Sequence, residues 1–351
     1  MILDPILDIF RGKAVTIPPL DGAFRPNTQL DDAPAFAELS EPDNLLAAGD
    51  RLLASSANAV YAIQAGGEPK VVETFPSTVT ALALSPSGEL TVGLESGRLL
   101  ISGKDVSLPA GIRCITALAY ADDGTLWLAN GSAEHAPSQW AADLMKKGAS
   151  GSLWKRDATG GEFRKVAGDI AFPYGLYPVG RDVLVSESWR HQLVRFDGVT
   201  GSRSTVLTHL PGYPARLSPA ADGGAWLALF APRNRLIEFV LQETHYRQDM
   251  LEQVPPAYWI APSLASSRSF LEPLQCGGIR TMGIHKPWSP SRSYGLVVKL
   301  DGDMQPQFSL HSRANGSRHG ICSVAESDGR LFVASKGGDC VLALDVASGG
   351  F

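Results

Sequence analysis

Four residues in this sequence carry side chains that could act on a substrate: His319, Cys322, Asp43 and Arg216. His319 precedes Cys322 by three residues, so the two could form a Cys–His nucleophile, or His319 could act alone as a general base. Asp43 offers a carboxylate for acid–base chemistry. Arg216 offers a guanidinium that can hold a carboxylate through two hydrogen bonds. Each has a structural alternative, because a lone strand cysteine usually packs in the core and Arg216 could simply pair with Asp43.

These residues lie near the starts of short apolar strands that belong to a repeated unit. The unit is a strand, a turn bearing Gly or Asp, and a second strand, which is the pattern of a hairpin. Copies of it begin at Asn44, Ala81, Ala117, Gly175, Arg216 and Ser323. An all-β unit that recurs at roughly 40–50 residues is typical of a propeller rather than a solenoid. The sequence therefore predicts an all-β fold, a six-bladed β-propeller.

The propeller geometry predicts where a functional site would be. The innermost strand of each blade runs along the central axis, so its first residues face the mouth of the axial tunnel. We therefore take His319, Asp43 and Cys322 as candidate catalytic residues. The candidate substrate-binding residues are Arg216, Tyr174, Thr116, Asn44, Tyr213 and Trp140. The aromatic members of this set could line a cavity, although most propeller tryptophans belong to the core.

The spacing of the copies predicts one domain with two insertions. Residues 37–351 would form the propeller, and residues 1–36 would form an N-terminal cap that also supplies a closing outer strand. The two long gaps between copies predict insertions at about 132–150 and 244–293. Helical spacing around Trp140 predicts a lid over the axis in the first insertion. Ordered insertions of this length usually cover a site.

Composition excludes several classes of function. The chain has 351 residues, is 44% hydrophobic and 19% charged, and can bury a large core. Its formal charge of −5 gives no basic face for nucleic acid. No apolar stretch is long enough to span a membrane. The expected partner is thus a small-molecule substrate, and the oligomeric state stays open.

The N-terminus and the cysteines give weaker signals. The first 15 residues lack the basic region and cleavage site of a signal peptide, which favours a cytoplasmic location. They could form an amphipathic membrane anchor, but a short helix that caps the barrel fits their two aspartates better. The four cysteines show no CxxC spacing, which argues against zinc, and their even number permits disulfides without requiring them.

Two stretches carry a resemblance to a known family: 186–196 (SESWRHQLVRF) and 210–214 (LPGYP). Over roughly 37–345 the chain resembles the strictosidine synthase-like family, which includes the adipocyte plasma membrane-associated proteins. Paraoxonases and gluconolactonases are more distant relatives. The resemblance implies a six-bladed propeller, in agreement with the repeats.

The same resemblance implies a calcium site whose ligands are mostly replaced here. Calcium-dependent relatives hold an axial ion with carboxylate and amide groups at the starts of inner strands. Those positions fall at Asp43, Thr116, Tyr174, Ala215 and Arg216. Calcium takes six to eight oxygen ligands, and a guanidinium among them would repel it. We therefore expect no metal and no cofactor, with Arg216 placing a fixed positive charge where the ion would be.

The resemblance also bears on the reaction. The catalytic glutamate of the strictosidine synthases falls at Cys322, so that activity itself is not expected. The leading hypothesis is a metal-independent hydrolase of lactone or ester type that acts on a small, possibly anionic, molecule, with Arg216 as anchor and His319 for proton transfer. One alternative is a condensing enzyme or lyase for amine and aldehyde substrates, with Asp43 as base. The other is a propeller that binds a small molecule without catalysis.

Overall fold

The computed structural model describes residues 17–49, 51–64, 67–265, 272, 280–281, 284–285 and 292–346. The helix expected within the first 15 residues lies outside the described residues. Most of the C-terminal half of the insertion expected at 244–293 also lies outside the described residues.

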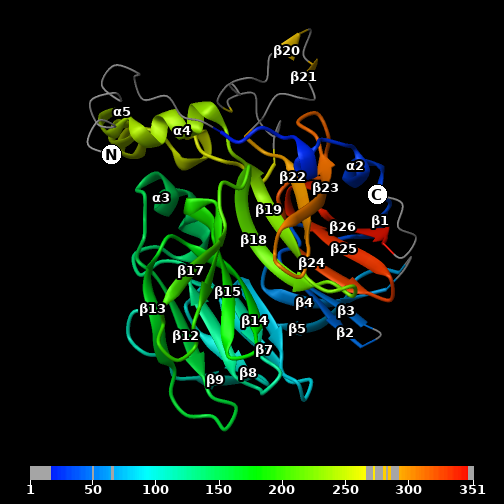
Figure 1. The fold of residues 1–351 in the computed structure, drawn as a ribbon, viewed down its shortest axis with the longest axis vertical. Coiled ribbons are helices and arrows are strands. Elements are labelled where there is room, and N and C mark those ends of the chain that lie inside the picture. The colour runs from blue at the N-terminus through cyan, green and yellow to red at the C-terminus, as the bar shows by residue number, and fades with distance from the viewer. Residues whose placement is uncertain are drawn as a thin grey trace.

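In the described part of the chain, six four-stranded antiparallel sheets surround a central axis, which confirms the six-bladed β-propeller (Figure 1). Blade one comprises β2 (Leu45–Ala48), β3 (Arg51–Ser56), β4 (Ala59–Ile63) and β5 (Lys70–Thr74). Blade two comprises β6 (Val79–Leu84), β7 (Leu90–Leu94), β8 (Leu99–Ile101) and β9 (Lys104–Val106). Blade three comprises β10 (Ile115–Tyr120), β11 (Leu126–Asn130), β12 (Gly151–Arg156) and β13 (Arg164–Ile170).

The remaining blades follow the same order from the axis outward. Blade four comprises β14 (Pro173–Val179), β15 (Asp182–Glu187), β16 (Gln192–Phe196) and β17 (Arg203–Leu207). Blade five comprises β18 (Gly212–Pro219), β19 (Ala225–Pro232), β22 (Gly295–Leu300) and β23 (Pro306–Ser312). Blade six comprises β24 (Ile321–Ser327), β25 (Arg330–Ser335), β26 (Cys340–Asp345) and the N-terminal strand β1 (Ala35–Glu38). Because β1 pairs with β26, the two ends of the chain meet in one sheet and close the ring.

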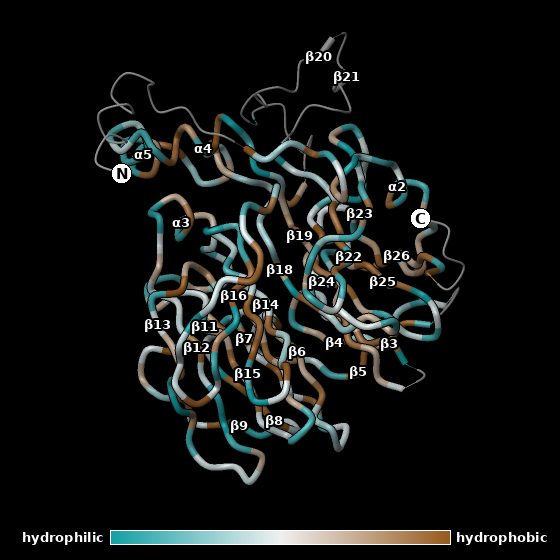
Figure 2. The backbone as a smooth tube through the Cα atoms, viewed as in Figure 1, coloured by the Kyte–Doolittle hydropathy of each residue, from teal (hydrophilic) through white to brown (hydrophobic). Residues whose placement is uncertain are grey.

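Alternating side chains hold neighbouring blades together. In β15, Val183 and Val185 are buried in one cluster with Trp127 of blade three. Leu184, which points to the opposite face, is buried with Leu227 of blade five. Burial of each such side chain stabilises the fold by about 1.5–3 kcal/mol, so the period-2 pattern fixes both faces of a blade. Figure 2 shows the hydrophobic segments concentrated in the strands.

Helices cover one end of the propeller. Short 3-10 helices are η1 (Gly22–Phe24), η2 (Pro137–Gln139), η3 (Ser188–Arg190), η4 (Pro256–Tyr258) and η5 (Lys336–Gly338). The α-helices are α2 (Gln29–Asp32), α3 (Trp140–Met145), α4 (Arg235–Gln242) and α5 (Thr244–Gln253). α3 lies against α5, and both are near α4 at the same end of the molecule (Figure 1).

The second insertion begins earlier than expected. The segment between β19 and β22 starts at 233 rather than near 244, because Asn234 accepts a hydrogen bond from the Leu236 N–H at 2.8 Å and caps α4. Two strands of this segment, β20 (Arg280–Thr281) and β21 (Ile284–His285), form a separate hairpin.

An ion cluster joins α4 to blade four and predicts a pH dependence of stability. Glu238 accepts a hydrogen bond from Arg233 at 2.8 Å and lies 3.5 Å from His191. Burial alone raises the pKa of Glu238, but His191 and Arg233 outweigh it and lower that pKa to about 2. Because the pKa is depressed in the folded state, the stabilisation is present above the ordinary value of 4.5 and is lost as pH falls towards 2.

We therefore expect Glu238→Gln to lower the melting temperature at neutral pH. The difference in melting temperature between wild type and Glu238→Gln should become smaller as pH falls below 4.5. Thermal unfolding followed by circular dichroism at a series of pH values measures this. Glu162→Gln, at an exposed position, is the matched control and should follow wild type throughout. A difference that stays constant down to the acid limit would contradict the assigned ion cluster.

Candidate active site at the propeller axis

A pocket of about 470 Å³ lies at the axial mouth that α3 covers. Four of its residues are aromatic (Trp140, Phe172, Tyr174 and Phe230), and four are charged (Glu41, Asp43, Glu95 and Lys336). Both inserted segments contribute to its lining, through Trp140 of α3 and through Leu264. A cavity of this size suits a small organic ligand.

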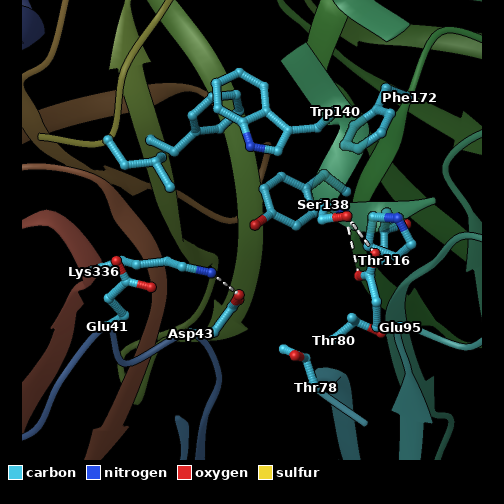
Figure 3. A pocket seen from close by; sticks show the side chains of 14 residues that line it. Glu41, Asp43, Thr78, Thr80, Glu95, Thr116, Ser138, Trp140, Phe172 and Lys336 are labelled. Atoms are coloured by element: carbon cyan, nitrogen blue, oxygen red, sulfur yellow. Dashed lines mark hydrogen bonds and ion pairs between the residues drawn. The ribbon is translucent and has the colours of Figure 1, made fainter. Parts of the chain in front are cut away.

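Asp43 and Lys336 form an ion pair on one side of the pocket (Figure 3). Asp43 directly precedes the inner part of blade one, and Lys336 opens η5 after β25 of blade six. The Lys336 Nζ lies 2.5 Å from Asp43 Oδ2. Burial alone raises the pKa of Asp43, but Lys336 and Arg216 outweigh it and hold that pKa below its ordinary value. Asp43 in turn overcomes the effect of burial on Lys336 and raises the pKa of its ammonium.

Arg216 lies beneath this pair, and its guanidinium is held by backbone oxygens. Its Nη1 donates to Asp43 Oδ1 at 2.6 Å and to the Asp43 carbonyl at 3.1 Å. Its Nη2 donates to the carbonyls of Thr80 at 2.6 Å and Thr116 at 3.1 Å. A longer contact of 3.4 Å reaches the Cys322 carbonyl. One buried cation thus ties together the inner strands of blades one, two, three, five and six.

A close approach of two inner strands positions Arg216. A Cβ added at Gly175 of β14 would lie 2.3 Å from the Ala215 oxygen and 2.9 Å from the Arg216 Cα. Only glycine leaves room for β18 at this distance. The Arg216 guanidinium also lies 4.8 Å from the centre of the Tyr174 ring, in cation–π contact.

These residues do not fit a calcium ion. The guanidinium of Arg216 occupies the centre of the converging carbonyls, and the Thr116 hydroxyl donates to the Pro173 carbonyl at 2.5 Å. The remaining carboxylate, Asp43, is already paired with two cations. Among the residues that the structure describes, no group of three or more His, Cys, Asp or Glu side chains could hold a metal ion.

The structure brings five of the candidate residues together at the pocket and places the others outside its lining. Asp43, Thr116, Tyr174 and Trp140 line the pocket, with Arg216 directly below Asp43. The structure corrects the expectation for His319, which does not line this pocket. Its Nδ1 is 2.9 Å from Ser293 Oγ, and its Nε2 is 2.8 Å from the Arg313 carbonyl. Both ring nitrogens therefore bond to residues that do not line this pocket.

Cys322, Asn44 and Tyr213 also differ from their expected places. Cys322 is buried in hydrogen-bond contact with Tyr174, and burial raises the pKa of its thiol to about 11. The Asn44 amide donates to Ser55 Oγ at 2.8 Å and lines the tunnel on the far side of Arg216. Tyr213 is fully buried behind Phe230, with ring centres 5.5 Å apart. We therefore assign these three to packing and hydrogen bonding within the fold.

Sequence reasoning missed Lys336, Glu95 and Phe230. In an antiparallel blade the second strand ends beside the start of the first, so residues at its end face the same mouth. Lys336 follows β25, Glu95 follows β7, and Phe230 lies near the end of β19. The repeated unit could have indicated these residues, because it locates the end of the second strand as clearly as the start of the inner strand.

Comparisons with known proteins agree with this fold. No protein-family profile matches the chain. The zebrafish (Danio rerio) adipocyte plasma membrane-associated protein is 28% identical over 151 residues, which cover 37% of this chain and 36% of that protein. The mouse (Mus musculus) protein of the same name is 24% identical over 240 residues, which cover 59% and 58%. The chain thus spans about a third to somewhat over half of the length of these relatives, and they confirm the expected resemblance at low identity.

Solved structures of gluconolactonase propellers are also similar. A gluconolactonase from Xanthomonas campestris aligns with a TM-score of 0.55 at 16% identity and covers 88% of this chain and 86% of its own. A putative gluconolactonase aligns with a TM-score of 0.54 at 13% identity and covers 89% and 91%. At such identities the similarity shows the fold alone. Among the described residues, none of the helices has the length and apolar character needed to cross a bilayer.

Proposed function

We propose that this protein is a metal-independent hydrolase of lactone or ester type that acts on a small organic molecule in the axial pocket. The observation that carries the proposal is the Asp43–Lys336 pair, an ionised carboxylate and an ammonium 2.5 Å apart on the pocket wall. The fold that the chain shares with gluconolactonases and with adipocyte plasma membrane-associated proteins is compatible with such a role.

The other candidate groups leave this pair as the source of chemistry. Cys322 is held as a thiol because burial raises its pKa to about 11, and a thiol is a poor nucleophile. Lys336 keeps its proton because Asp43 raises its pKa, so it cannot attack a carbonyl as a free amine. It can instead stabilise negative charge on a carbonyl oxygen, as a metal ion does in other hydrolases.

The proposed step uses both members of the pair. A water oxygen attacks the acyl carbon while Asp43 accepts one water proton. The carbonyl oxygen gains negative charge beside the Lys336 ammonium. When the ester C–O bond breaks, the proton on Asp43 passes to the departing alkoxide. The products are a carboxylic acid and an alcohol, or one hydroxy acid from a lactone.

The experiment that tests the proposal is a turnover assay on protein stripped of metal with a chelator. The panel contains lactones, aryl esters and amine–aldehyde pairs. We expect hydrolysis of lactones or esters at the same rate before and after chelation, because the positive charges at the site are Lys336 and Arg216. Activity that disappears with chelation would overturn metal independence. Amine–aldehyde coupling without hydrolysis, or binding without turnover, would overturn the assignment as a hydrolase.

A further inference from the structure

We propose that the axial pocket recognises its substrate through an alkylammonium group, held between an aromatic wall and the carboxylate of Glu95. This inference rests on the proposed hydrolase and deepens it: the substrate would be an ester or lactone that carries a tertiary or quaternary ammonium. It replaces the expectation of an anionic substrate held by Arg216.

The aromatic wall has the geometry of a cation site. The Trp140 and Phe230 ring centres are 5.4 Å apart at 76° to each other. The Tyr174 and Phe230 centres are 5.7 Å apart at 75°, and the Phe172 and Tyr174 centres are 5.8 Å apart at 68°. One face of Tyr174 already holds the Arg216 guanidinium, and Phe172 stacks on Trp189, so the wall offers an alkylammonium ion Trp140, Phe230 and the remaining faces of the other two rings.

The charges around the pocket favour the same class of ligand. The carboxylate of Glu95 lines the pocket apart from the ion pairs that Asp43 forms with Lys336 and Arg216. The two cations are both paired with Asp43, and the Arg216 Nη atoms donate to backbone carbonyls. An anionic ligand would therefore compete with Asp43 for its cations, whereas a cationic group can pair with Glu95.

Glu95 is fixed in place on the wall opposite the ion pair. The Ser138 N–H lies 3.1 Å from Glu95 Oε1 and 3.2 Å from Oε2, and the Ser138 hydroxyl donates to Oε1 at 2.5 Å. Figure 3 shows Glu95 and Ser138 on one side of the pocket and Lys336 with Asp43 on the other. An ammonium beside Glu95 would thus leave the acyl group of the same molecule near Lys336.

One residue of the pocket lining carries a buried hydroxyl. Thr80 is 7% exposed and lines the pocket. Within the described residues, its Oγ1 has no hydrogen-bond partner. A buried hydroxyl without a partner is costly.

A matched pair of esters tests the inference. Acetylcholine and 3,3-dimethylbutyl acetate have nearly the same shape. Acetylcholine carries a quaternary nitrogen at the position where the neutral ester carries a quaternary carbon. We expect kcat/KM for the cationic ester to exceed that for the neutral ester by about tenfold or more. Glu95→Gln should remove most of this preference. Glu89→Gln, an exposed glutamate at the other end of β7, is the matched control and should keep the preference.

Binding measured by calorimetry separates this inference from the hydrolase. Choline is compared with the neutral 3,3-dimethylbutan-1-ol, and Trp140→Leu serves as a second variant on the aromatic wall. Choline that binds more tightly than the alcohol, with the difference lost in Glu95→Gln and Trp140→Leu, supports the cation site even if neither ester is hydrolysed. Equal hydrolysis of both esters together with equal binding of both alcohols would overturn the cation site and leave the hydrolase standing.

Discussion

Arg216→Ala is expected to destabilise the folded protein by about 3–5 kcal/mol, the loss that follows when one partner of a buried ion pair is removed. The variant leaves the carbonyls of Thr80 and Thr116 without this donor and the Asp43 carboxylate with Lys336 as its remaining cation. It also removes the group that joins the inner strands of five blades. Urea unfolding at neutral pH measures the change in the free energy of unfolding.

Two further variants sharpen this prediction. Arg216→Lys keeps the charge, but one ammonium cannot reach carbonyls on several strands at once. We therefore expect its free energy of unfolding to lie between those of wild type and Arg216→Ala. Arg98→Ala is the matched control, because Arg98 pairs with Asp105 on the surface and its side chain is 46% exposed. The control should unfold like wild type. If Arg216→Ala were as stable as the control, the guanidinium would not hold the axis together.

The sequence was sufficient to predict the propeller because its signal is local. Each hairpin carries its own alternation of apolar residues and its own turn, and the blades repeat that signal. The starts of the inner strands then indicated Asp43, Thr116, Tyr174 and Arg216. The pairing of Arg216 with Asp43, which was one of two open alternatives, is the arrangement that the structure contains.

The sequence-based predictions failed for side chains near the starts of strands, where the direction of the side chain depends on the local backbone. β24 begins at Ile321, and Gly320 before it has a positive φ of 66°. His319 therefore lies outside the strand and turns towards Ser293 and Arg313 instead of the axis. The register of β18 shifts on both sides of Pro214, so Tyr213 cannot be placed by counting back from Arg216. Neither the turn nor the shift is visible in a pattern of apolar residues.

Lys336 was missed for a different reason. It follows the second strand of blade six, and its role depends on Asp43 from blade one, 293 positions earlier in the chain. The two residues meet because the ring closes between blades six and one. Long-range pairing of this kind follows from the closed ring once the fold is known, but the residues themselves show no motif.

Lys336→Met is expected to lower kcat for ester or lactone hydrolysis by about 10²–10³-fold, the usual cost of removing one group that stabilises an oxyanion. The fold should survive, because Arg216 still pairs with Asp43 at 2.6 Å. Lys336→Arg restores the charge and should recover part of the activity. Lys104→Met, on the exposed outer strand β9, removes an equal charge from the surface and should act like wild type.

The most direct measurement is kcat/KM of metal-stripped wild type and metal-stripped Lys336→Met on the best substrate of the panel, with the melting temperature of each recorded beside it. The proposed mechanism predicts full wild-type activity without metal and a loss of about 10²–10³-fold in a variant that still unfolds cooperatively above the assay temperature. A folded Lys336→Met protein with wild-type activity would contradict the role of the Asp43–Lys336 pair as the catalytic centre.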